Sequence, residues 1–84
     1  MNIETQIRTY IAEHILFSSD GFPHDNDASF LDEGVIDSMG VMELVAFVKS
    51  SFQVEVEARD VTPQNFDSVT RLAAYVRGKQ AVAA

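Results

Sequence analysis

The chain passes from a loop into an apolar helix in the stretch GVIDSMG (residues 34–40), which is followed directly by VMELVAFV (residues 41–48). A single serine, Ser38, stands at this junction, after Asp37 and before Met39. Apolar residues then recur at helical spacing and predict a helix over about residues 38–51. This junction therefore divides the chain into a loop before Ser38 and a helix after it.

The helix that begins at Ser38 carries apolar residues on more than one side. Its predicted core face is one sector of the helical wheel, made of Val41, Leu44, Val45, Val48 and Phe52. A second group, the methionine patch (Met39, Met42 and Ala46), lies on another side near Ser38. This group is explained either by burial of the helix on all sides or by an exposed surface of the adaptable kind that methionine favours.

The other helices follow from spacing and capping residues. Ile3, Ile7, Ile11 and Ile15 predict a helix over residues 3–16, with Asn2 as N-cap. Thr62-Pro63 predicts a short helical turn. Asp67 or Ser68 is expected to cap a last helix that ends near Arg77, with Gly78 as its stop and residues 79–84 as a frayed tail. The apolar face of this last helix is Val69, Leu72, Ala73 and Val76.

Two segments are expected to lack regular structure. Residues 18–29 are rich in turn formers and predict a long loop. This loop is expected to be pinned to the core by Phe22, Phe30, Leu31, Val35 and Ile36. Residues 52–57 alternate like a strand, but no second strand is evident, so we expect an extended connector. The sequence therefore predicts one all-α domain over residues 1–84, a small four-helix bundle of three main helices and one short helix.

The charge distribution points to protein partners. The chain has a net charge of −7, and no Lys or Arg lies between Arg8 and Lys49. Eight acids fall in that interval: Glu13, Asp20, Asp25, Asp27, Asp32, Glu33, Asp37 and Glu43. Such a surface repels nucleic acid and anionic lipid and attracts basic protein surfaces and divalent cations. The alternative is a solvated acidic face that only keeps a small protein in solution. No signal peptide or membrane-spanning run is apparent, so a cytoplasmic location is expected.

Catalytic and metal sites find little support in the sequence. There is no cysteine for a disulfide or thiolate site. Asp25-Asn26-Asp27 begins like a calcium loop, but Phe30 and Ile36 occupy the positions that need Gly and Glu. His14 is expected at the edge of the apolar stripe of the first helix, where a ligand or catalytic role is an alternative.

Ser38 has three interpretations from the residues alone. It is an N-cap, a role for which serine is a preferred type. It is a nucleophile, although G-x-S-x-G is absent because Ile36 occupies the first glycine position, and only His14 and His24 are available as base. It is a site of modification, since a hydroxyl at a helix start is accessible and the helix N-terminus favours an attached anion.

A resemblance favours modification. Residues 30–39 (FLDEGVIDSM), followed by Glu43-Leu44-Val45, resemble the phosphopantetheine attachment region of acyl and peptidyl carrier proteins. The resemblance covers almost the whole chain and includes the helix order. Residues 65–69 (NFDSV) are similar to the segment entering the last helix in many members, notably free-standing ones. Gly40 departs from the family pattern, in which many members carry an acidic or larger residue.

The resemblance implies a free-standing, monomeric carrier protein that is not itself an enzyme. A phosphopantetheinyl transferase would esterify Ser38 with 4′-phosphopantetheine, and Asp37 would aid metal-dependent loading. Acyl or aminoacyl groups would then be carried as thioesters to enzymes of fatty acid, polyketide or nonribosomal peptide biosynthesis. The expected docking face is the methionine patch with its surrounding acids: Asp32, Glu33, Met39, Met42, Glu43 and Ala46. The alternative is an unmodified helical interaction module that uses the same face.

Overall fold

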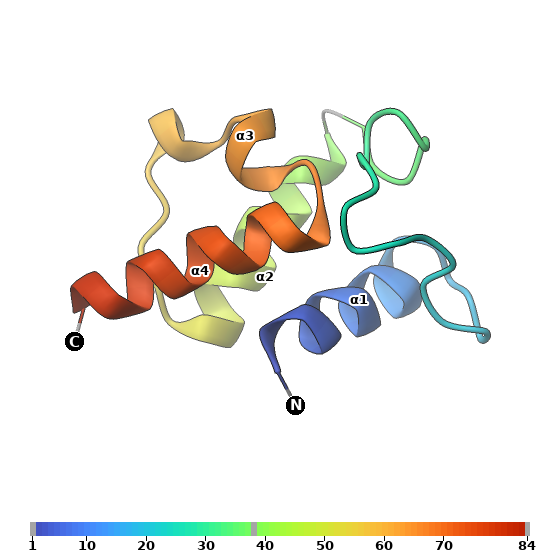
Figure 1. Cartoon of the computed structure of the whole chain (residues 1–84), viewed down its shortest axis with the longest axis horizontal. Helices are drawn as coiled ribbons and strands as arrows, with labels where there is room; N and C mark the ends of the chain where they lie inside the picture. The colour runs from blue at the N-terminus through green and yellow to red at the C-terminus, as the bar shows by residue number, and fades with distance from the viewer. Residues whose placement is uncertain (1, 38, 84) are drawn as a thin grey trace.

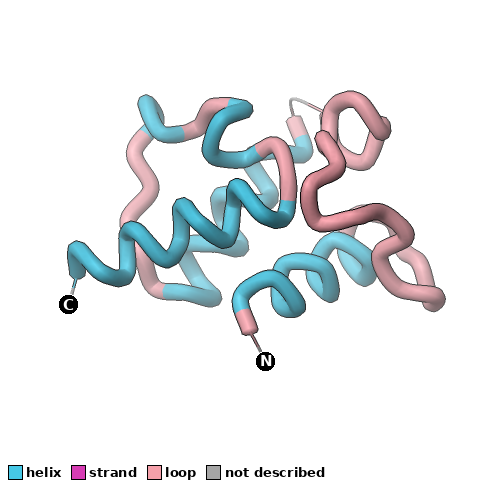
Figure 2. The backbone as a smooth tube through the Cα atoms, in the orientation of Figure 1, coloured by secondary structure: helices cyan, strands magenta, loops and turns pink. Residues whose placement is uncertain are grey.

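The computed structural model describes residues 2–37 and 39–83, and this part of the chain is helical without a strand (Figures 1 and 2). Its α-helices are α1 (Ile3–His14), α2 (Gly40–Phe52), α3 (Pro63–Phe66) and α4 (Val69–Ala83). A single 3₁₀ turn, η1 (Ala58–Asp60), precedes α3 and was not predicted. The predicted small all-α bundle with a long first loop is confirmed.

The helix starts follow the capping residues in the sequence. The Asn2 side chain accepts a hydrogen bond from the backbone N–H of Thr5 at 2.7 Å, as expected of an N-cap. Pro63 is the first residue of α3. Of the two candidate caps for α4, Ser68 accepts the hydrogen bond from the backbone N–H of Arg71, at 3.0 Å. The start of α2, at Gly40, is two residues later than predicted.

The predicted end of the last helix near Arg77 was wrong, because α4 continues through Gly78 to Ala83. Gly78 is exposed, and no atom lies within 4 Å of the place a Cβ would occupy, so packing does not require a glycine there. The helix continues through it. Lys79 adds a tertiary contact beyond the glycine, since its ammonium lies 3.3 Å from the carboxylate of Asp60. Tertiary contacts therefore outweigh the weak stop signal of one glycine.

One core joins all the main elements. The predicted apolar face of α4 is fully buried, and α4 packs against both α1 and α3. Figure 1 shows α4 crossing the bundle, with α1 beside it. From α2, Leu44, Val45 and Val48 enter the same cluster as Ile7 and Ile11 of α1. Val41 and Phe52, also predicted for the core face, are only partly buried.

The connector after α2 is extended, as expected. It begins at Gln53, whose left-handed backbone (φ 54°) closes α2. Val54 is buried, while Phe52 and Val56 pack partly against the core. At the end of the connector, Asp60 accepts a hydrogen bond from the Tyr75 hydroxyl at 2.8 Å, which fixes η1 to α4. This hydrogen bond, with help from Lys79, holds the pKa of the Asp60 carboxyl below its usual value.

The second half of the first loop (residues 15–39) is fixed by Asp67, which lies at the joint between α3 and α4. The Asp67 carboxylate accepts hydrogen bonds from the Ser29 hydroxyl and from the backbone N–H of Leu31, the latter at 3.0 Å. The Asp67 carbonyl accepts the N–H of Phe30 at 2.8 Å. We call this set of contacts the Asp67 clamp. It holds Phe30 in the core, where that side chain is 1% exposed.

The near half of the same loop is fixed by Arg8 of α1. One guanidinium nitrogen donates to the carbonyl of His24 at 2.8 Å and to the side chain of Asn26 at 2.9 Å. The other nitrogen donates to the carbonyl of Phe22 at 2.9 Å, and the guanidinium lies 4.9 Å from the centre of the Phe22 ring. The prediction that the loop is pinned to the core holds for four of the five apolar residues; it was wrong for Leu31, which is 48% exposed because the Asp67 clamp holds its backbone at the surface.

Two substitutions separate the core face of α2 from its outer face. Leu44 is fully buried, so Leu44→Ala should leave a cavity and lower the free energy of unfolding by about 2–5 kcal/mol. Met42 is 61% exposed, so Met42→Ala should lower it by no more than about 1 kcal/mol. Urea melts of both variants measure the difference. Equal losses would contradict the assignment of Met42 to the surface.

The Asp67 clamp is tested by Asp67→Ala. The substitution leaves the Ser29 hydroxyl and the Leu31 N–H without their charged acceptor, which should cost about 1–3 kcal/mol in urea melts. Amide hydrogen exchange at Leu31 should become faster. Asp27→Ala removes an exposed acid from the same loop and should do neither. If both variants behave alike, general charge relief explains the effect and the clamp does not.

Candidate functional site

The residues on either side of Ser38 form an exposed, braced helix start. Ser38 itself lies outside the described residues. Asp37, directly before it, is exposed, and its Oδ1 accepts a hydrogen bond from the backbone N–H of Gly40 at 2.7 Å. The Asp37 carbonyl accepts the N–H of Val41 at 3.2 Å. Asp37 thus caps α2 and places a negative charge at the positive end of its dipole.

Gly40 is explained by the close approach of α2 to this segment. A Cβ at residue 40 would lie 2.9 Å from Cγ2 of Ile36 and 3.4 Å from Oδ1 of Asp37. Ile36 is buried, at 3% exposure, so it has little room to move. A side chain at residue 40 would therefore push the cap or the core residue away. Glycine at residue 40 therefore lets Ile36 and Asp37 pack closely against the start of α2.

The methionine patch is exposed, which rules out burial of α2 on all sides. Met39 is 82% exposed, Met42 is 61% exposed, and Ala46 is also exposed. Phe47, on the third side of the helix, is instead covered by Tyr10, whose ring stacks on it at 4.1 Å between centroids. Outside its core face, α2 therefore has Phe47 covered by Tyr10 on one side and the exposed methionine patch on another.

The acids expected around the methionine patch are all exposed, but they come from different elements. Glu43 lies on α2 itself, one position beyond Met42. Asp32 and Glu33 lie in the turn that follows Phe30, where the backbone N–H of Asp32 donates to the Ser29 hydroxyl at 3.2 Å. The Glu33 carboxylate lies 3.8 Å from a ring nitrogen of His24. The Asp67 clamp thus supports the turn that carries Asp32 and Glu33, and Asp37 caps the helix that carries Glu43.

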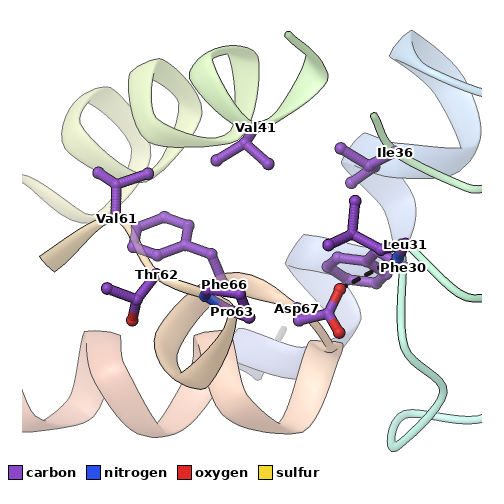
Figure 3. A pocket seen from close by; sticks show the side chains of 9 residues that line it. All are labelled: Phe30, Leu31, Ile36, Val41, Val61, Thr62, Pro63, Phe66 and Asp67. Atoms are coloured by element: carbon purple, nitrogen blue, oxygen red, sulfur yellow. Dashed lines mark hydrogen bonds between the residues drawn. The ribbon is translucent and has the colours of Figure 1, made fainter. Parts of the chain in front are cut away.

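An apolar pocket of about 220 Å³ lies between α2, the first loop and α3. Figure 3 shows Val41 of α2 pointing into it, with Ile36 and Leu31 on one side and Val61 and Phe66 on the other. Phe30, Thr62, Pro63 and Asp67 complete the lining. Val41 is therefore only partly buried, because one side of it faces the pocket.

The sequence predicted the exposed residues of the site better than its supports. Arg8, the Asp67 clamp and the apolar pocket were missed, since each depends on contacts between residues far apart in the chain. Arg8 contacts residues 22–26 and Asp67 contacts residues 29–31, and neither pairing has a local signal in the sequence. His14 stacks on Tyr10 at 4.9 Å between ring centroids, which places it at the edge of the α1 stripe as expected.

Other site chemistries find no support in the part of the chain that the structure describes. Among residues 2–37 and 39–83, no group of three or more His, Asp or Glu side chains is arranged to hold a metal ion. Within the same ranges, every helix is too short or too polar to cross a lipid bilayer. The exposed acidic and methionine-bearing surface around residues 37–46 is the best candidate for function.

Comparison with known proteins supports the resemblance. Residues 6–76 match the protein family described as "Phosphopantetheine attachment site". The match covers all of α2 and α3, most of α1 and the first half of α4, together with the first loop and residue 38. No curated protein matches the chain significantly. With most of its length matched, the chain belongs to the phosphopantetheine-attachment family of carrier proteins, whose members hold a covalently attached 4′-phosphopantetheine group.

Proposed function

We propose that Ser38 is the residue that carries 4′-phosphopantetheine. The observation that carries the proposal is the braced helix start: Asp37 caps α2, Gly40 packs on Ile36, and the neighbours Asp37 and Met39 are both exposed. A residue between two exposed neighbours at a fixed turn is well placed for an enzyme to reach. The surrounding residues therefore fit a tethered group that must move between partners.

The loading reaction is a phosphoryl transfer. The Ser38 hydroxyl oxygen forms a bond to the diphosphate phosphorus of coenzyme A that carries the pantetheine arm. The bond from that phosphorus to the bridging oxygen breaks, 3′,5′-ADP leaves, and the serine proton passes to a base of the transferase. Metal ions commonly neutralise the diphosphate in such transfers. We propose that Asp37, one residue away, contributes its negative charge to that metal while it caps α2.

The attached arm supplies a thiol that holds acyl or aminoacyl groups as thioesters. The chain contributes presentation and docking, and the bond-forming steps belong to partner enzymes. The apolar pocket supports an apolar acyl cargo, since it is lined by Val41, three residues after Ser38, and by Ile36, two residues before it. Within the range of fatty acyl, polyketide, aminoacyl and peptidyl groups, a short hydrocarbon chain suits this lining best.

We further propose that the carrier is free-standing and monomeric and docks to basic enzyme surfaces through the methionine patch. The similarity of residues 65–69 to free-standing members supports the first point. Exposed Met39 and Met42 supply deformable apolar contact, Glu43 supplies negative charge beside Met42, and Asp32 and Glu33 add exposed negative charge on the preceding loop. The rival proposal is an unmodified interaction module, for which the same exposed face is the supporting observation.

Replacement of the attachment residue tests the proposal directly. Incubation with a phosphopantetheinyl transferase and coenzyme A should add one phosphopantetheinyl group to the wild-type chain and none to Ser38→Ala, as read by intact mass. The circular dichroism spectrum should be unchanged, because Asp37 still caps α2. Ser50→Ala, at the other end of α2, is the control and should be loaded like wild type. A wild-type chain that gains no mass would favour the unmodified module.

Charge reversal tests the docking face. Glu43→Lys inverts an exposed charge beside the methionine patch and should slow association with the transferase several-fold at low salt, with less effect at high salt. Stopped-flow association rates measure this. Glu55→Lys makes the same change in net charge on the exposed connector and should have little effect. Equal slowing by both variants would mean that net charge steers the partner and that the face has no special role.

A further inference from the structure

A second exposed surface lies next to the residues on either side of Ser38 (34–37 and 39, here called the attachment segment), on the side of α1. It is an open depression with one wall from the end of α1 and the residues after it, and another from the attachment segment and the start of α2. Phe17 belongs to the first wall and Met39 to the second. Each of these two side chains is 82% exposed, the largest exposure among the large hydrophobic residues described.

Phe17 is held outward by an unusual backbone. Its φ is 53°, in the left-handed region that favours glycine and asparagine over aromatic residues. The two residues before it, Ile15 and Leu16, turn inward and pack against the core. Phe17 lies outside that core, so its ring contributes no burial that would offset the backbone strain. The turn at Phe17 serves the end of α1, because the N–H of Ser18 donates to the carbonyl of Ala12 at 2.8 Å, but the fold does not require an aromatic ring there. The exposed ring is therefore free to contact a partner.

The charge around the depression identifies the kind of surface that would cover Phe17. All the lining residues fall in the interval between Arg8 and Lys49, which contains no Lys or Arg. Asp37 and Glu43 line the depression, and Glu13 is exposed next to the lining residue His14. An apolar group ringed by basic residues is therefore complementary to this surface.

The position of the depression identifies which enzyme needs it. An enzyme that acts on the thiol can stand away from the protein by the length of the flexible arm. An enzyme that attaches the arm must bring its own substrate to the Ser38 oxygen, and must therefore cover Asp37 and Met39, the residues on either side. Both of these residues line the depression.

We propose that Phe17 and this depression form a docking site for the phosphopantetheinyl transferase, which would place an apolar group against Phe17 and Met39 and basic groups against Asp37 and Glu43. This proposal rests on the assignment of Ser38 as the attachment residue. It adds to the methionine patch a contact from Phe17, in the first loop just after α1, which was not among the residues predicted for the docking face. Phe17 acts as a docking residue and takes no part in the transfer of the arm.

The test replaces Phe17 with residues that separate its backbone from its ring. Phe17→Asn suits the left-handed backbone and removes the ring; Phe17→Tyr keeps the ring. With a transferase that loads the wild-type chain, Phe17→Asn should raise KM for the carrier about tenfold, the size of a contact hot spot, and leave kcat within twofold. Phe17→Tyr should behave like wild type. The melting temperature of Phe17→Asn should stay level or rise.

Binding is measured separately, since KM equals a dissociation constant only when the chemical step is slow. In the Ser38→Ala background, where no transfer occurs, Phe17→Asn should weaken the equilibrium affinity for the transferase by the same factor. Gln53→Asn is the matched control, because Gln53 is exposed and has the same left-handed backbone (φ 54°) at the far end of α2. It should leave affinity and KM within twofold of wild type.

Several results would overturn the proposal. Unchanged affinity and KM in Phe17→Asn would remove Phe17 from the docking site, while loading of the wild-type chain at Ser38 would leave the proposed function in place. A clear drop in melting temperature would show that Phe17 supports the fold. Concentration-dependent dimerisation of wild type, lost in Phe17→Asn, would assign the surface to a second copy of the chain. A wild-type chain that cannot be loaded would instead refute the proposed function itself.

Discussion

The carboxylate of Asp67 is the constraint on which the position of the chain before α2 depends. It lies at the joint between α3 and α4 and holds residues 29–31, which are more than thirty positions earlier in the chain. With Phe30 fixed in the core, its carbonyl accepts the N–H of Val35 at 2.9 Å and closes a compact turn. Gly34 makes that turn possible with a φ of 70°. The turn delivers buried Val35 and Ile36, and these seat Asp37 at the start of α2.

A long loop can therefore serve as a rigid part of the site. Arg8 fixes its first half through the carbonyls of Phe22 and His24, and the Asp67 clamp fixes its second half. Satisfied carbonyls and a buried Phe30 leave little conformational freedom, although the described residues of the loop, 15–37 and 39, contain no regular helix or strand. The cost of this order is offset by the core that the loop helps to build. As a result, Asp37 and Met39 are both exposed just before α2.

Features that depend on neighbouring residues in the chain were predicted correctly, whereas features that depend on contacts between distant residues were missed. The periodicity of Leu44, Val45 and Val48, the Asn2 cap and the Thr62-Pro63 turn each depend on residues a few positions apart, and the structure confirms them. The left-handed backbone of Phe17 and the clamp from Asp67 to Ser29 depend on the assembled fold, and no pattern of nearby residues encodes them. The end of α4 was misplaced because Gly78 was judged without the contact between Lys79 and Asp60 beyond it.

We propose that Ser38 is the residue of this chain that carries 4′-phosphopantetheine, and peptide mapping tests this most directly. The chain contains seven serines, and the others are Ser18, Ser19, Ser29, Ser50, Ser51 and Ser68. After loading with coenzyme A and a phosphopantetheinyl transferase, the chain should be digested and its fragments sequenced by tandem mass spectrometry. The account predicts one phosphopantetheinyl group, on Ser38 alone. A group found on any other serine, with Ser38 unmodified, would contradict it.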